Sequence, residues 1–152
     1  MQHFLNILTI LAFFMSSATW LYTLYTHSIK LSIEVKDHAK RFGSVQLYLY
    51  FQNNSAQYLA ITGISILDKD RKLPCNALRS ILRVQDGSAL IETPTLPVNL
   101  SPCHGVCHAF SFSDCQNIEL AEGKTLALEI YTNRCVLKRS VILPPQDHIL
   151  HF

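Results

Sequence analysis

Charged side chains are absent from the first 29 residues of this 152-residue chain, because every Lys, Arg, Asp and Glu lies at or beyond Lys30. Within this segment, residues 4–25 form an unbroken, mostly apolar run of 22 residues. At about 1.5 Å per helical residue, such a run reaches roughly 33 Å, which matches a hydrocarbon core of about 30 Å. The sequence therefore predicts a transmembrane or targeting helix in which residues 4–25 contact the lipid bilayer.

The common catalytic signatures are also missing. The chain contains no G-x-S-x-G, H-E-x-x-H or paired-carboxylate pattern. Gly123-Lys124-Thr125 resembles the end of a phosphate-binding loop, but Ile118 stands where that loop requires glycine. The formal net charge of +2 is too small to predict a nucleic-acid partner. We therefore expect a protein that is not an enzyme, has no catalytic or cofactor-binding residues, and binds no nucleic acid.

The apolar leader has two interpretations, a cleavable signal peptide and an uncleaved anchor. Ser16-Ser17-Ala18 could serve as a cleavage site, but Met1-Gln2-His3 lacks the basic side chain that signal peptides carry. The apolar run continues well beyond that site. Trp20, Tyr22 and Tyr25 gather at its carboxyl end, where aromatic rings favour the lipid–water interface. We favour a single-span anchor.

The side of the membrane that the rest of the chain faces is predicted from basic residues and cysteines. Lys30, Lys36, Lys40 and Arg41 follow the span closely, whereas no Lys or Arg precedes it. The positive-inside tendency then places the domain on the cytoplasmic face. An odd count of five cysteines also fits a reducing compartment better than a disulfide framework.

Two glycosylation sequons point to the opposite side. They are Asn53-Asn54-Ser55 and Asn99-Leu100-Ser101, and Pro102 disfavours the second. Such triplets are common by chance, so the cytoplasmic face is favoured and the other face stays open.

Beyond the span, the hydrophobic period is two. Residues 29–36 and 45–52 each alternate apolar and polar side chains, which is typical of half-buried strands. Residues 58–67 continue the pattern, and Gly63 predicts a bulge at which the inward register changes. No segment after residue 27 has a convincing helical period. We expect a core that includes Leu47, Leu49, Ile66, Phe112, Leu128 and Ile130.

Further short strands are predicted in the second half of the chain. Residues 80–84 and 89–92 flank Asp86-Gly87, a hairpin signal. Prolines confine residues 96–100 to an edge or crossing segment. The remaining strands are expected at residues 106–112, 125–132 and 136–143.

The fold class is therefore mainly β, with an N-terminal transmembrane helix followed by one antiparallel immunoglobulin-like β-sandwich. The expected parts are an anchor over 1–27, a β-sandwich domain over 28–146 and a tail over 147–152. About 120 residues suffice to bury a core without disulfides or metal.

One segment could carry metal or thiol chemistry. Residues 103–108 contain four soft or borderline ligands, Cys103, His104, Cys107 and His108. In an extended strand, residues four apart are separated by about 13 Å, too far for one ion or one disulfide unless the chain turns at His104-Gly105. The C-x-x-x-C-H spacing also differs from the haem-attachment motif. We interpret these residues as ordinary side chains at a strand edge and assign no metal ligand.

Several segments together resemble small single-span β-sandwich proteins of Gram-positive bacteria. They are the uncharged span and residues 30–35 (KLSIEV), 45–67, 95–102 (TLPVNLSP) and 130–143 (IYTNRCVLKRSVIL). The resemblance covers most of the chain and implies a membrane-anchored β-sandwich. No activity is attached to that group, so it implies no functional residue.

Two classes of function follow. The first is a membrane-tethered, non-enzymatic module that binds an unknown protein partner through a sheet edge or face. The alternative is a metal-binding or thiol-redox module centred on residues 103–108, in which Cys107 could pair with Cys115 or Cys135 on a neighbouring strand.

Overall fold

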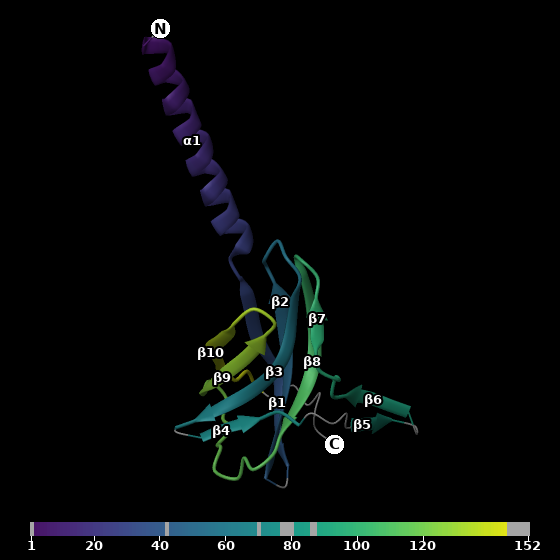
Figure 1. Cartoon of the computed structure of the whole chain (residues 1–152). Coiled ribbons are helices and arrows are strands. Elements are labelled where there is room, and N and C mark those ends of the chain that lie inside the picture. The colour runs from purple at the N-terminus through teal and green to yellow at the C-terminus, as the bar shows by residue number, and fades with distance from the viewer. Residues whose placement is uncertain (1, 42, 70, 77–80, 86–87, 146–152) are drawn as a thin grey trace.

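The structure is a computed structural model that describes residues 2–41, 43–69, 71–76, 81–85 and 88–145. A long helix projects from a β domain (Figure 1). The elements are α1 (Gln2–His27), β1 (Leu31–Arg41), β2 (Ser44–Asn53), β3 (Leu59–Asp68), β4 (Arg71–Pro74), β5 (Ile81–Gln85), β6 (Ser88–Glu92), β7 (Val98–Leu100), β8 (His104–Phe112), β9 (Thr125–Thr132) and β10 (Val136–Ile142).

Helix α1 has the properties expected of a membrane span. Its stretch His3–Leu24 is long and apolar enough to cross a bilayer, and none of it is buried against the domain. Hydroxyl groups within the stretch bond to the helix itself; the Thr9 hydroxyl, for example, donates to the Leu5 carbonyl at 2.9 Å. Side chains satisfied in this way need no water partner in an apolar environment. The predicted N-terminal apolar helix is confirmed.

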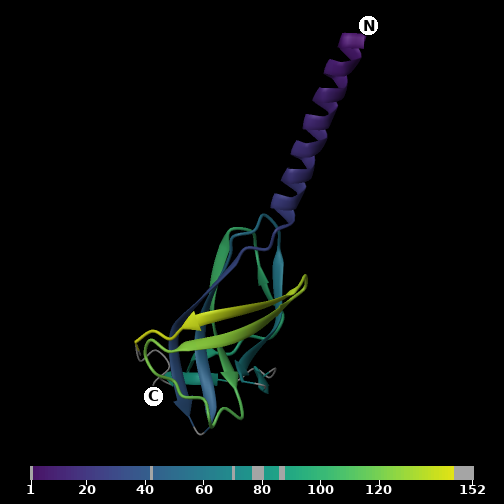
Figure 2. The same ribbon diagram turned by 90° about the vertical axis from the view of Figure 1, so that its left-hand side faces the viewer.

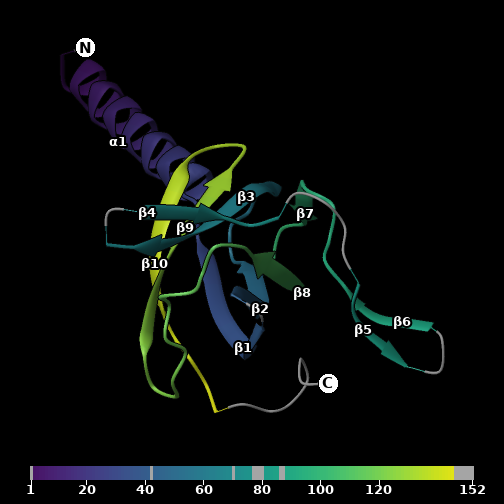
Figure 3. The same cartoon turned by 90° about the horizontal axis from the view of Figure 1, so that it is seen from below.

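The β domain consists of two antiparallel sheets packed face to face. Sheet A has the order β1-β2-β8, and sheet B has the order β10-β9-β3-β4 with β7 also paired to β3. Figure 2 shows the β9–β10 hairpin crossing over the strands of sheet A. The β5–β6 hairpin forms a separate pair that extends from the side of the sandwich (Figure 3). The mainly β, antiparallel fold class is confirmed, whereas the immunoglobulin-like assignment stays a prediction.

The core lies between the two sheets and contains the predicted positions. All six inward residues named from the sequence are fully buried. The β3–β9 register shifts between Ile61 and Gly63, so Ile61 and Ile64 both face the core, as expected from a bulge at the glycine. The alternation of apolar and polar residues therefore predicts both these strands and the face that each one buries.

The structure differs from the prediction most clearly at β1, β4 and β8. Strand β1 continues to Arg41, because a bulge between Val35 and Asp37 lets the chain change register and stay paired. The short strand β4 was not predicted, since its four residues have no clear alternation. Strand β8 begins at His104 and not at residue 106, so no turn occurs at His104-Gly105. The proposed tail over 147–152 lies outside the described residues.

The loops nearest the helix form one tied cluster. The Lys30 amide donates to the Ser55 hydroxyl at 3.1 Å, and the Asn54 amide donates to the Lys30 carbonyl at 2.7 Å. The buried Asn53 amide group donates to the Gln57 carbonyl at 2.8 Å and to two carbonyls at the end of β7. We call this cluster the helix-proximal end; it comprises residues 28–30, 54–58, 101–103 and 133–135.

Candidate functional site

Strand β8 has an edge whose hydrogen-bonding groups face outward. The Asn76 amide donates to the Ser111 carbonyl at 2.7 Å, so the backbone groups of Ser111 point away from β2. Along a strand, the N–H and C=O groups of successive residues point alternately to one side and to the other. The β2–β8 register has no shift, so this alternation is unbroken along β8. The backbone groups of Gly105, Cys107 and Ala109 therefore also point away from β2. Among the described residues, this edge is paired only by the bridge between Cys75 and Phe112.

The open part of β8 lacks the features that usually protect an edge strand. Exposed edges are normally protected by lysine, proline, bulges or very short strands. The other edge strands of sheets A and B have such protection: β1 has a bulge and Lys36, β10 carries Lys138 and Arg139, and β4 and β7 have only four and three residues. Residues 105–108 of β8 are Gly-Val-Cys-His and have none. Within the two sheets of the sandwich, this edge is therefore the one best suited to accept a further strand.

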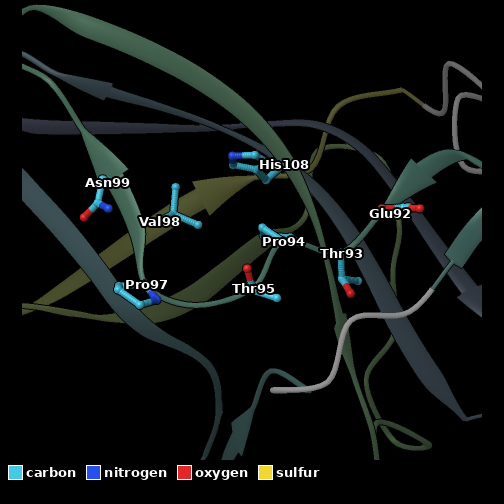
Figure 4. Close-up of a pocket in the computed structure, with 8 residues that line it drawn as sticks. All are labelled: Glu92, Thr93, Pro94, Thr95, Pro97, Val98, Asn99 and His108. Carbon is cyan, nitrogen blue, oxygen red and sulfur yellow. The ribbon is translucent and has the colours of Figure 1, made fainter.

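A groove lies beside this edge. It has a volume of about 480 Å³ and separates β8 from the segment that connects β6 to β7 (Figure 4). In Figure 4 the imidazole of His108 lies at the groove across from Pro94 and Val98. The groove is lined by Glu92, Thr93, Pro94, Thr95, Pro97, Val98, Asn99 and His108. Its mixture of apolar walls and a few polar groups suits a side chain of an added strand.

His108 is the titratable group most clearly affected by this setting. It is half-buried and lies opposite the buried Leu49 on β2, so it faces the inner side of sheet A. Burial lowers the pKa of His108 below its usual value, because desolvation disfavours the imidazolium. A neutral imidazole in the groove can donate or accept a hydrogen bond.

The outer face of the same strand carries a different surface. Cys107 is exposed and lies opposite Tyr50 of β2. The Tyr50 ring covers Gly105 so closely that a Cβ at that position would lie 2.2 Å from the phenolic oxygen. Lys36 Nζ lies 5.5 Å from the centre of this ring and 2.8 Å from the Glu34 carboxylate. The glycine is thus required by the ring above it.

The four candidate ligands of residues 103–108 do not converge. Cys103 is exposed in a turn with a φ of 55°, and His104 begins β8. Cys107 and His108 are successive residues of one strand and point to opposite faces of sheet A. Within the described ranges, no group of three or more His, Cys, Asp or Glu side chains could hold a metal ion.

The cysteines are all free thiols. Cys115 is fully buried, and burial raises the pKa of both Cys75 and Cys115. These two thiols are therefore protonated at neutral pH and have low reactivity. The Cys107 to Cys115 or Cys135 pairing considered from the sequence is not formed.

Neither the groove nor the role of Gly105 could be predicted from the sequence. The groove depends on the placement of the β6–β7 connection beside β8, which no local pattern specifies. Pro94 and Pro97 were the available signal, because they mark a crossing segment. The sequence also could not reveal that Asn53, the acceptor of one sequon, is fully buried and bonded through its amide nitrogen.

Comparison with known proteins gives little further information. No protein-family model matches the chain, and no curated protein matches it. Among solved structures, the chain is similar to a copper-bound PCuAC domain from PmoF2, at 14% identity and a TM-score of 0.49 over 78% of this chain and 96% of that one. The copper belongs to that protein, and no residue role is transferred from it.

Proposed function

We propose that this protein is a membrane-tethered, non-enzymatic interaction domain that binds an extended polypeptide segment along the open edge of β8. The observation that carries the proposal is the unprotected edge over residues 105–108, with the groove beside it. A bound segment would add a fourth strand to sheet A through the outward backbone groups of Gly105, Cys107 and Ala109. One of its side chains would enter the groove and contact His108.

The membrane part of the proposal is supported by α1. Its apolar stretch His3–Leu24 has the length of a span, and only residues 28–30 separate the helix from β1. Such a short connection keeps the β8 edge close to the bilayer and restricts its orientation. The tether would favour partners that are themselves at the membrane, since it raises their effective concentration.

We place the domain on the cytoplasmic face. The basic residues after the span support this orientation through the positive-inside tendency. Burial of Asn53 weakens the opposing argument, because its amide is not accessible to a glycosyltransferase in the folded domain. Membership of the group of small single-span proteins from Gram-positive bacteria is part of the same proposal and supplies no residue roles.

The edge can be tested with one substitution and a matched control. Cys107→Pro removes an outward N–H that β2 does not use, so it blocks strand addition and leaves the β2–β8 pairing intact. Cys107→Ser changes the same side chain and keeps the N–H. A photoreactive amino acid at the exposed Thr95, in the groove, should yield a crosslinked partner in native membranes. The same group at the exposed Ile142 is the positional control.

We expect the adduct from position 95 to persist in Cys107→Ser and to disappear in Cys107→Pro, while position 142 yields none. An adduct with twice the mass of the chain would identify the partner as a second copy of this chain. Equal crosslinking in the two Cys107 variants, with equal melting temperatures, would show that the edge is not the binding surface.

A further inference from the structure

Strand β8 has a fixed direction relative to the membrane helix. Leu31, Asn53 and His104 lie in one row across sheet A, because Leu31 pairs with Asn53 and Asn53 pairs with His104. Leu31 is the first residue of β1, and only residues 28–30 separate it from α1. Both pairings are antiparallel, so β8 is parallel to β1. Each of these two strands therefore begins next to the helix and runs away from it.

The open part of the β8 edge is the part nearest the helix. At the far end of the strand, Cys75 bridges to the last residue of β8, and the Asn76 amide donates to the Ser111 carbonyl at 2.7 Å. The segment that contains Cys75 and Asn76 thus occupies the edge there and blocks a strand that would continue past Ser111. Within the described ranges, no strand lies along the edge over residues 104–108. An added strand can therefore extend beyond this stretch only toward the bilayer.

The open stretch is also short. Gly105, Cys107 and Ala109 direct their backbone groups outward, which provides only three N–H donors and three C=O acceptors. Each such hydrogen bond adds little net stability, because it replaces bonds to water. A freely diffusing peptide would in addition lose its translational and rotational freedom on binding. So few bonds favour a partner that is already held beside the edge, as a span in the same bilayer would hold it.

Antiparallel addition suits this edge better than parallel addition. In an antiparallel pair, a residue with outward groups exchanges both of its bonds with the residue opposite, whereas the bonds of a parallel pair are slanted and slightly less stable. Every strand pair described in this structure is antiparallel. Since β8 runs away from the bilayer, an antiparallel strand runs toward it. The carboxyl end of the added strand then leaves the sheet at His104, next to the bilayer.

A second copy of this chain cannot provide such a strand from its own β8. Antiparallel pairing of two β8 strands requires a twofold axis perpendicular to the sheet, and this axis reverses the direction of one copy. Because α1 enters the domain at the end where β8 begins, the two helices would leave the pair at opposite ends. They could not lie in one bilayer.

We propose that the strand added to β8 belongs to a different protein that spans the same membrane, and that this strand directly precedes the span in that protein's sequence. The strand runs antiparallel to β8, and its chain then enters the bilayer beside α1. In this chain, residues 25–30 connect the apolar stretch to the row that contains His104, so the partner needs a connection of similar length. The inference rests on the β8 edge and the anchor of the proposed function, and it holds for either side of the membrane.

The test determines the direction of the bound strand from two crosslinking sites in native membranes. A photoreactive amino acid at the exposed Thr95 lies in the groove with His108. A second one, at the exposed Cys103, lies directly before β8 and nearer the helix. Mass spectrometry of the digested adducts identifies the partner residue attached at each position. Cys107→Ser and Cys107→Pro are the matched variants, since only proline removes the outward N–H.

We expect both adducts to contain the same segment of one protein, within about 15 residues of an apolar stretch long enough to span a bilayer. The partner residue attached at position 103 should lie closer to that stretch than the one attached at position 95. Both adducts should persist in Cys107→Ser and disappear in Cys107→Pro.

The captured segment then supplies a matched pair of probes. It is placed directly before or directly after the same polyleucine span, and each peptide is reconstituted with the full chain in nanodiscs. The peptide with the segment before the span should give roughly tenfold more adduct from position 95, because only this arrangement lets an antiparallel strand run toward the bilayer. The segment without a span should give even less adduct at the same concentration.

The opposite order of the two attached residues, or equal adduct from the two peptides, would overturn the direction of the strand. Adducts with a protein that has no span near the attached segment, or with a second copy of this chain, would overturn the membrane-spanning partner but leave the β8 edge as the binding surface. The absence of any adduct at positions 95 and 103 would overturn the proposed function itself, and this inference with it.

Discussion

The two halves of strand β8 differ although they share one partner. Residues 109–112 are fully buried, whereas residues 104–108 are exposed or half-buried. Both halves pair with β2 in a single unbroken register from His104 to Phe112. Backbone pairing is therefore the same in the two halves, and the difference must come from what lies over them.

The buried half is covered on its edge and on its outer face. Cys75 bridges to Phe112, and Ile91 belongs to a small cluster with Ala109 and Ala39 on the outer face of sheet A. The open half has the groove beside it and no described strand along its edge. Both halves of β8 are paired with β2, but among the described residues only 109–112 are also covered by other parts of the chain. Residues 104–108 are left uncovered and are therefore the part available to a partner.

The largest expected difference is in stability. Phe112 is fully buried in the core, so Phe112→Ala should lower the free energy of unfolding by about 3 to 5 kcal/mol, as aromatic core truncations do. His104→Ala at the exposed start of the same strand should cost no more than about 0.5 kcal/mol. Chemical unfolding of the chain in detergent micelles measures both. Equal losses would show that the two halves are equally structural.

A second prediction concerns the contact between Gly105 and Tyr50. Gly105→Ala should lower the free energy of unfolding by about 1 to 3 kcal/mol, since the new Cβ would meet the phenolic oxygen at 2.2 Å and displace the ring. The same substitution in a Tyr50→Ala background should cost much less. A double-mutant cycle measured by chemical unfolding gives the coupling, and a coupling near zero would contradict the contact.

The third prediction uses the titration of His108. Because its pKa is lowered from 6.5 by burial, the unfolded chain binds a proton first as pH falls. The folded state keeps its full stability above the pKa that His108 has in the unfolded chain. It loses stability as the pH falls from that pKa toward the lower pKa of His108 in the folded domain. His108→Gln should remove this part of the acid destabilisation, measured as unfolding free energy between pH 7 and pH 5, with His104→Gln as the matched control. An unchanged pH slope in His108→Gln would contradict a buried neutral imidazole.

The smallest effect is expected from the exposed thiols. Replacing Cys103 and Cys107 together by Ser should change the unfolding free energy by no more than about 0.5 kcal/mol, because both side chains are exposed. A chelator should leave the melting temperature unchanged. If chelator lowered the melting temperature of the parent, and the double substitution lowered it equally, residues 103–108 would form a structural metal site.

Most of the fold could be predicted from the sequence, whereas the candidate site could not. Period-two alternation identified β2 and β9, and Gly63 marked the bulge in β3, because each signal lies within a few adjacent residues. Coverage of β8 depends on Cys75 and Ile91, which are far from it in sequence. The Cys and His residues of segment 103–108 are conspicuous in the sequence. The open backbone edge of the same segment cannot be recognised from the identities of its side chains.

The connection between α1 and sheet A has a mechanical consequence. The helix leads into β1, β1 pairs with β2, and β2 pairs with β8. Tension exerted on a strand bound to β8 would reach the bilayer through the strand ladders of sheet A alone, without crossing the core to sheet B. A pull along the strands would load many hydrogen bonds in shear at once, so the domain is built to resist being drawn away from its anchor.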